Sequence, residues 1–221
     1  MLKKINVTKI IIAMMFSFIV MSFSAVSAND QVSPAQQLDN QIESAKNIKL
    51  IQKFFSFSTS YDIVIGDDVV GHIKGDFYHP FGDDLKIQTL SGQTIYSEQQ
   101  QRRLLNLSIA RGGVFVNQDD QPVGAIREEM FMLFSHQFKI FNQDGHHIGQ
   151  SYQDPWHFFS KYYKIVNKKN KTIISGKSES LHLTTQIKVQ RVTPSNTVSM
   201  KQALLIMTIE EAIDEANSNN D

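Results

Sequence analysis

The chain has 221 residues, of which 41% are hydrophobic and 10% aromatic, and it contains no cysteine. This composition is globular, and the length allows one sizeable core. The absence of cysteine excludes disulfides, thiolate metal sites, a cysteine nucleophile and the lipid-modified cysteine of an exported lipoprotein. With 22 basic and 22 acidic side chains, the bulk charge gives no reason to expect nucleic acid as a partner.

The first 28 residues have the pattern of an export signal peptide. Lys3, Lys4 and Lys9 precede an apolar run over residues 10–21, and the segment ends in the small residues of the stretch AVSA. The run is too short to span a bilayer comfortably, so cleavage after Ala28 is expected rather than retention as a membrane anchor. The mature chain is then periplasmic or secreted, and 19 basic side chains remain against 22 acidic ones.

Residues 29–53 are predicted to form a polar leader followed by an amphipathic helix. Ser33 and Pro34 suit the start of a helix, as cap and first-turn residue. Apolar residues then recur at spacings of three and four, which predicts one apolar stripe. These residues are Leu38, Ile42, Ala45, Ile48 and Ile51. We expect the stripe to pack on the domain that follows.

From residue 54 onward the chain changes to short alternating runs separated by Gly, Asn and Asp, which is typical of strands and turns. One pattern recurs four times, a Phe followed six residues later by an Ile, and we expect these side chains in the core. The pairs are Phe57 and Ile63, Phe81 and Ile87, Phe134 and Ile140, and Phe159 and Ile165. The starts are 24, 53 and 25 residues apart. The middle interval therefore has room for a diverged copy, which VFVNQDDQPVGAI supplies.

Each copy continues as an apolar strand, a turn and a second strand, so the repeating unit is a hairpin. The turn residues tolerate positive φ or bind their own backbone. They are Asp67-Asp68, Ser91-Gly92, Asp119-Asp120, Asp144-Gly145 and Lys169-Asn170. Five hairpins and a further strand over residues 181–192 predict about twelve antiparallel strands. Because closure removes sheet edges that invite aggregation, the predicted fold class is mainly β, with a closed antiparallel barrel.

Residues 199–216 predict a helix that is apolar almost all round between residues 203 and 209. Such a helix needs burial on every side, and a barrel of about twelve strands is wider than its own side chains can fill. We therefore expect the helix to lie inside the barrel. Its core residues are Leu204, Leu205, Ile206, Met207, Ile209 and Ile213. Glu210, Glu211 and Asp214 are expected where the helix leaves the interior, and residues 217–221 form a disordered tail after a barrel domain of residues 54–216.

Repeated hairpins that begin with a Phe and a Ser or Gly, followed by a hydrophobic helix ending in AIDEA, resemble the LURP-one-related family of the tubby C-terminal-like (phospholipid scramblase-like) superfamily. The resemblance covers residues 51–216. It implies a closed twelve-stranded barrel threaded by its C-terminal helix, with phospholipid scramblases and phosphoinositide-binding tubby domains as relatives. It transfers no lipid-binding or catalytic residue, and the export signal departs from the many cytoplasmic relatives.

Three histidines, His136, His146 and His147, lie near Asp144 and raise the question of a metal site. Consecutive strand residues point to opposite faces, so the last two cannot share one small site. Neighbours in the sequence supply no further converging ligands, and the stretch NQDG lacks the alternating oxygen ligands of a calcium loop. We therefore expect turn and surface histidines, with Asn142 and Asp144 as turn formers, and no metal or other cofactor.

The best surface candidate is a hairpin whose lysines have no acidic residue between them. The lysines are Lys161, Lys164, Lys168, Lys169, Lys171 and Lys177. Just upstream, the ring of Trp156 suits a membrane interface. Together these residues predict contact with an anionic lipid surface. The alternative is a solvated edge hairpin, on which lysines prevent pairing with other strands.

The sequence contains no G-x-S-x-G elbow, no H-E-x-x-H pair and no phosphate loop, so we expect no enzyme. The first hypothesis is an exported, non-catalytic barrel that binds lipid or a membrane surface. The second is an envelope or secreted module that binds a protein partner, with the N-terminal helix as its docking element.

Overall fold

The computed structural model describes residues 32–53, 60–75, 84–100, 103–105, 108–110, 112–129, 137–154, 160–181, 184–195 and 197–218. In this part of the chain there are two helices, α2 (Pro34–Ser44) and α3 (Met200–Ser218), and fourteen strands. The strands are β1 (Asn47–Gln52), β2 (Ser60–Ile65), β3 (Asp68–Gly75), β4 (Leu85–Thr89), β5 (Thr94–Gln100), β6 (Arg103–Leu105), β7 (Ser108–Ala110), β8 (Gly112–Asn117), β9 (Pro122–Glu128), β10 (Phe138–Asn142), β11 (His147–Asp154), β12 (Ser160–Asn167), β13 (Thr172–Leu181) and β14 (Thr184–Arg191).

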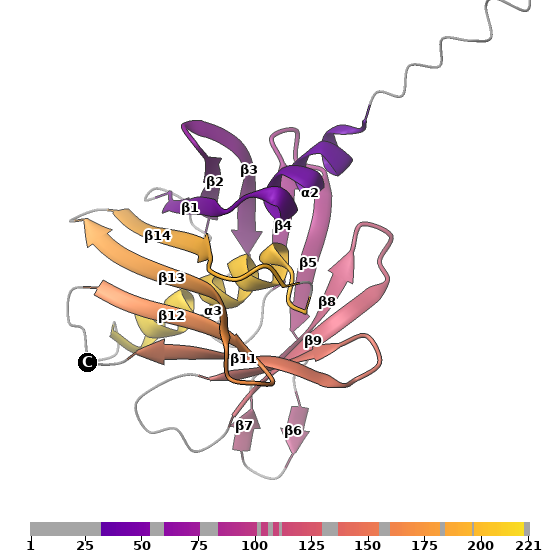
Figure 1. Ribbon diagram of the computed structural model, residues 1–221, viewed down its shortest axis with the longest axis vertical. Coiled ribbons are helices and arrows are strands. Elements are labelled where there is room, and N and C mark those ends of the chain that lie inside the picture. Colours follow the sequence, from indigo (N-terminus) through magenta and orange to yellow (C-terminus); the bar gives the residue numbers. More distant parts are fainter. Residues whose placement is uncertain are drawn as a thin grey trace, which may run out of the picture. The chain divides into compact units, whose positions relative to one another are not determined.

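Twelve of these strands form one closed barrel, which confirms the predicted fold class (Figure 1). Around the barrel the order is β1, β14, β13, β12, β11, β10, β9, β8, β5, β4, β3 and β2, and each neighbouring pair is antiparallel. The five predicted hairpins are β2–β3, β4–β5, β8–β9, β10–β11 and β12–β13. Strands β6 and β7, which we did not predict, form a separate small hairpin.

The hairpin turns use two local devices that explain the repeated Asn and Gly. Each turn has one residue with positive φ, and these residues are Gly66, Gly92, Asp120, Gly145 and Asn170. Positive φ is tolerated best by Gly, Asn and Asp. In three hairpins the first strand ends at an Asn whose side-chain oxygen accepts a backbone N–H from the turn. These residues are Asn117 in β8–β9, Asn142 in β10–β11 and Asn167 in β12–β13. In the first turn, the residue with positive φ is Gly66, one residue before the predicted pair Asp67-Asp68.

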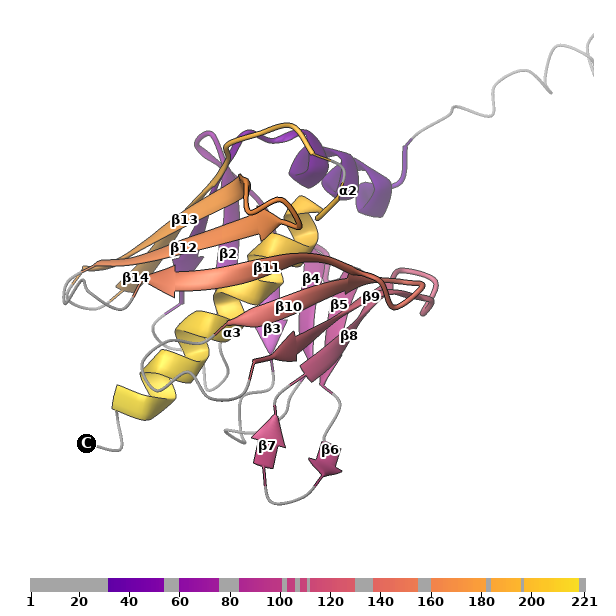
Figure 2. The ribbon, with the colours of Figure 1, turned by 60° about the horizontal axis from the view of Figure 1, so that its bottom comes forward.

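Helix α3 lies along the inside of the barrel, as Figure 2 shows. The side chains of its predicted core residues are all buried. The four described isoleucines of the Phe-to-Ile repeat, Ile63, Ile87, Ile140 and Ile165, are 0% exposed and belong to the same core. Their four phenylalanine partners, Phe57, Phe81, Phe134 and Phe159, lie outside the described residues. Helix and strands thus bury one continuous apolar core. Within the described ranges, neither helix has the length and hydrophobicity of a membrane-spanning helix.

The predicted N-terminal helix is shorter than expected, because its second half is a barrel strand. Helix α2 ends at Ser44, and β1 pairs with both β14 and β2. In β1, Ile48 and Leu50 are buried, which is the alternation of a strand. Helical spacing from Leu38 to Ile51 suggested one helix, but β1 provides the backbone hydrogen bonds that close the barrel. The first strand of the barrel therefore starts at Asn47, before the predicted start of the barrel at residue 54.

Helix α2 packs by its apolar stripe and also caps the start of α3. Ala35, Leu38 and Ile42 are buried in the core cluster. The Glu43 carboxylate accepts the backbone N–H of Met200 at 3.1 Å and that of the next residue at 3.3 Å. A carboxylate at this position satisfies the unpaired N–H groups and the positive end of the helix dipole. Helix α2 therefore holds the first turn of α3 in place.

Candidate functional site

Three lysines lie directly opposite one another on three neighbouring strands of the barrel. Lys177 of β13 is paired with Lys188 of β14, and Lys188 is paired in turn with Lys49 of β1. We call these three residues the lysine row. Like charges directly opposite each other on adjacent strands destabilise a sheet. The lysine row is therefore an electrostatic cost that a nearby anion would relieve.

One resident carboxylate relieves part of this repulsion. Glu179 of β13 lies 2.8 Å from the Nζ of Lys177 and 2.8 Å from the Nζ of Lys188. The hydrogen bonds and charges of these lysines lower the pKa of Glu179 to about 2, so it is ionised at neutral pH. Lys49 has no ion-pair partner within the described ranges. The lysine row with Glu179 thus keeps two positive charges in excess.

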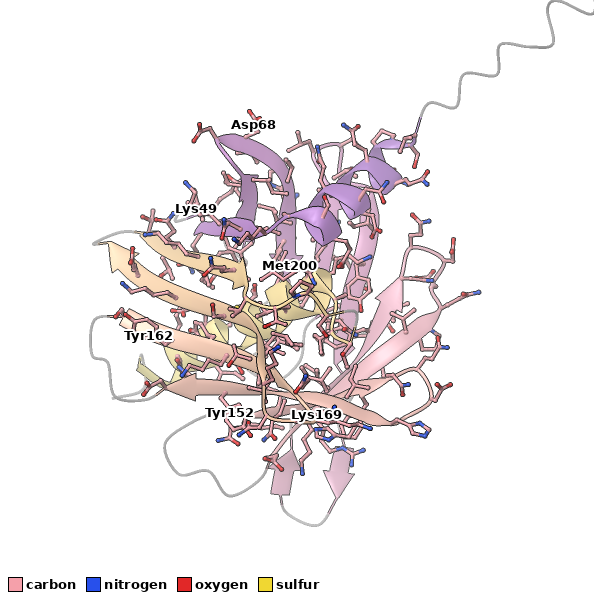
Figure 3. All side chains as sticks on the ribbon, in the orientation of Figure 1. Lys49, Asp68, Tyr152, Tyr162, Lys169 and Met200 are labelled. Atoms are coloured by element: carbon pink, nitrogen blue, oxygen red, sulfur yellow. The ribbon has the colours of Figure 1, made fainter. Side chains whose placement is uncertain are left out.

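The lysine row borders a groove of about 600 Å³ on the outer face of the barrel. Lys164 and Tyr162 of β12 border it on one side, and Lys49 of β1 borders it on the other. Among the described residues that line the groove, four are lysines and none is acidic. Figure 3 labels Lys49 and Tyr162, which lie on the same side of the molecule. We call this hollow with its four lysines the basic groove.

Besides the four lysines, the basic groove is lined by polar groups and by buried apolar and aromatic residues, which are Ile48, Val64, Tyr163 and Val189. Among the polar groups, Ser175 brings a hydroxyl, and Asn47 and Gln190 bring side-chain amides. The Nζ of Lys177 lies 5.6 Å from the centroid of the Tyr162 ring, within the range of a cation–π contact. The lysines and polar groups of this lining suit an anion that also carries hydroxyl groups.

Five of the six predicted lysines fall into two groups, and the sixth, Lys161, lies apart from both. Lys164 and Lys177 border the basic groove, as the prediction of a surface contact requires. Lys168, Lys169 and Lys171 are exposed at the turn between β12 and β13, and Figure 3 places Lys169 well apart from Lys49 and Tyr162. Trp156 lies outside the described residues.

Lys161 lies apart from the other predicted lysines, because its ammonium group is paired with helix α3. Its Nζ lies 3.0 Å from an oxygen of Glu211 and 3.1 Å from an oxygen of Asp214, both on α3. Burial lowers the pKa of Lys161, but these two carboxylates outweigh it and raise the pKa above its ordinary value. The reason for this pairing is strand alternation, because Lys161 shares the inward face of β12 with Tyr163 and Ile165.

The acidic residues of α3 also differ from expectation. Glu210 and Glu211 were expected where the helix leaves the barrel, yet they are 0% and 4% exposed. The Ser151 hydroxyl donates a hydrogen bond to Glu210 at 2.5 Å, and the Tyr163 hydroxyl donates one to Glu211. Burial raises the pKa of Glu210 to about 8, although the bond from Ser151 lowers it. Polar partners on β11 and β12 allow the helix to stay inside beyond its apolar stretch.

The histidines take different positions. His146 is exposed in the turn, where its backbone N–H donates to Asn142, and the side-chain amide of Asn142 donates to Asp144. His147 starts β11 beside the ring of Phe141, with ring centroids 5.8 Å apart. His136 lies outside the described residues. Within the described ranges, no three His, Asp or Glu side chains are grouped so that they could hold a metal ion.

The alternative of an edge hairpin is wrong for β12 and β13. Both strands have a neighbour on each side, because the barrel is closed. Lysines on these strands therefore do not protect a free sheet edge. The second part of the alternative, a lysine face that is only solvated, stays a hypothesis beside that of a binding surface.

Comparisons with known proteins give no relative from which a role for this site could be inferred. No family model matches the chain, and neither the curated proteins nor the solved structures contain a match. The function must therefore be argued from the charge, geometry and position of the basic groove.

Proposed function

We propose that this chain is an exported, non-catalytic barrel of the LURP-one-related and tubby-like kind that binds an anionic membrane surface through the outer face of β12, β13, β14 and β1. The observation that carries the proposal is the lysine row, in which three cations are held opposite one another on adjacent strands. The closed twelve-stranded barrel around a C-terminal helix agrees with the architecture that the resemblance implies.

The energy of such an interaction is sufficient for reversible adsorption. A lysine near an anionic bilayer contributes about 1 kcal/mol, and four lysines border the basic groove. Relief of the repulsion within the lysine row adds to this attraction. Because charge interactions at a surface are screened within about 10 Å at 0.1 M salt, binding should weaken steeply as salt rises.

The protein-binding alternative has less support, because its expected docking element is already occupied. The apolar stripe of α2 is buried in the barrel core, and Glu43 of the same helix caps α3. Only the polar side of α2 is left for a partner. A complex recovered without lipid would nevertheless favour this alternative, and the experiment below includes that outcome.

The proposal is tested by co-sedimentation of the exported protein with neutral phosphatidylcholine vesicles and with vesicles that also contain phosphatidylglycerol. Lys49→Gln with Lys164→Gln removes two lysines of the basic groove that have no ion-pair partner among the described residues. Lys168→Gln with Lys169→Gln is the matched control, because it removes the same charge at the exposed turn. Circular dichroism checks that both variants are folded.

We expect binding to the anionic vesicles only, with loss at moderate salt. The Lys49 and Lys164 variant should lose most of the binding, and the turn variant should keep most of it. Equal losses in the two variants would mean that only net charge matters. No binding by the native protein under any salt condition would overturn the proposal, most clearly if a protein complex is isolated instead.

A further inference from the structure

The basic groove concentrates its positive charge around one hollow instead of spreading it over a flat face. Its lysines come from four strands, β1, β12, β13 and β14, that are neighbours in the closed barrel. Strands lie about 4.8 Å apart, so β12 and β1, three strand spacings from each other, are roughly 14 Å apart. Long lysine side chains on both sides can then reach one compact group between them.

The charge of the basic groove favours a group with more than one negative charge. Four lysines border the groove, and Glu179 on its flank neutralises one of them. A phosphodiester carries one negative charge and would leave two lysines uncompensated. A phosphomonoester carries about 1.5 to 2 negative charges at neutral pH and offers three terminal oxygens as hydrogen-bond acceptors. Lysine ammonium groups form strong, charge-assisted hydrogen bonds with such oxygens.

The neutral polar groups beside the lysines also suit a ligand that carries a phosphate. Asn47 and Gln190 can donate or accept hydrogen bonds through their amides, and Ser175 through its hydroxyl. These groups suit the hydroxyl or ester oxygens that accompany a phosphate on a glycerol or a sugar. The groove volume of about 600 Å³ lies within the range of pockets that hold small ligands.

We propose that the basic groove is a binding site for a phosphomonoester, with Lys49 and Lys164 binding the phosphate from opposite sides. This inference rests on the proposed function and makes it more specific, because general attraction to an anionic surface would not distinguish a monoester from a diester. The phosphomonoester can be a lipid headgroup or a soluble molecule, and the two sources are separated by experiment.

The test compares binding to phosphatidylcholine vesicles that contain either phosphatidate, a phosphomonoester lipid, or phosphatidylglycerol, a phosphodiester lipid. The two vesicle types are matched in surface charge by their zeta potentials. Glycerol 3-phosphate serves as the soluble probe, both as a competitor and in direct calorimetric titration. The Lys49 and Lys164 double variant and the Lys168 and Lys169 control are measured in parallel.

We expect at least about tenfold tighter binding to phosphatidate vesicles, the ratio that one additional charge-assisted hydrogen bond provides. The preference should disappear in the Lys49 and Lys164 variant and persist in the turn variant. Competition by glycerol 3-phosphate would show that the groove also accepts a soluble phosphomonoester. A lack of competition with the preference intact would assign the site to the lipid headgroup.

Two results would overturn the inference, and they differ in what they say about the proposed function. Equal binding to both vesicle types would refute phosphomonoester recognition but leave membrane adsorption standing. No binding to either vesicle and no heat with glycerol 3-phosphate would refute both. Binding of glycerol 3-phosphate alone, lost in the Lys49 and Lys164 variant, would support the groove and refute the membrane role.

Discussion

The buried carboxyl of Glu210 leads to a quantitative prediction about pH. Its side chain is 0% exposed, and burial raises its pKa from 4.5 to about 8. Between these values the unfolded chain releases the proton and the folded chain keeps it. The folded state then binds more protons, so the free energy of unfolding falls as pH rises, at about 1.4 kcal/mol per pH unit.

The substitution Glu210→Gln should remove this dependence, because the amide resembles the protonated carboxyl and does not ionise. Ser151 can still donate its hydrogen bond to the remaining carbonyl oxygen. From pH 5.5 to 7.5, the stability of the variant relative to the native protein should increase by about 2 to 3 kcal/mol. Urea denaturation followed by far-ultraviolet circular dichroism at the two pH values measures this difference.

The comparison of two proteins cancels the titration of Glu98. Burial and the charge of Asp84 raise the pKa of Glu98 to about 8 as well. Asp68→Asn is a suitable control, because Asp68 is exposed in the hairpin between β2 and β3. This control should show the same pH slope as the native protein. If Glu210→Gln also kept the native slope, Glu210 would be ionised in the folded protein, and the reasoning from burial would be wrong.

Two further predictions concern the contacts of α3. In Gly124→Ala, the new Cβ would lie 2.7 Å from the carbonyl oxygen of Phe141 and 2.9 Å from the Gln202 side chain. We expect a loss of about 1–3 kcal/mol and a fall in Tm of at least several degrees, whereas an unchanged Tm would contradict the close packing. Glu43→Ala removes the carboxylate that caps Met200 and should cost about 1 kcal/mol. Thermal unfolding should show a smaller loss for Glu43→Gln, which keeps one acceptor, and equal losses would argue against a capping role.

The barrel itself could be predicted because its information is local. Each hairpin combines two alternating strands with a turn residue of positive φ, such as Gly145 or Asn170. The burial of Ile63 and Ile140 follows from the same alternation. These features act over about ten residues, so they are visible in the sequence without knowledge of the rest of the chain.

Strand β1 was missed because local and long-range preferences disagree there. Ile48 and Ile51 continue the helical spacing of α2, while Ile48 and Leu50 have the alternation of a strand. The choice is made by β14, about 140 residues later in the sequence, which pairs with β1 and closes the barrel. No local pattern contains this information.

The candidate site was half predicted for the same reason. Lys164 and Lys177 lie on one hairpin and were recognised, whereas Lys49 and Lys188 enter the basic groove from strands that meet only in the closed barrel. Strict alternation along β12 would have separated Lys161 from Lys164, because an odd spacing places them on opposite faces. The burial of Glu210 needed knowledge of polar partners on other strands and was not visible in the sequence.

Closure of the barrel also decides what the lysine row can do. In an open sheet, strands that carry opposing lysines could shift or separate at an edge and relieve the repulsion. Here β13, β14 and β1 each have neighbours on both sides, and α3 fills the interior beneath them. The barrel therefore holds the backbone positions of these lysines near one another before any ligand arrives. Binding of an anion does not have to order the backbone. Because these positions are fixed in advance, less ordering entropy opposes the binding of an anion at the lysine row.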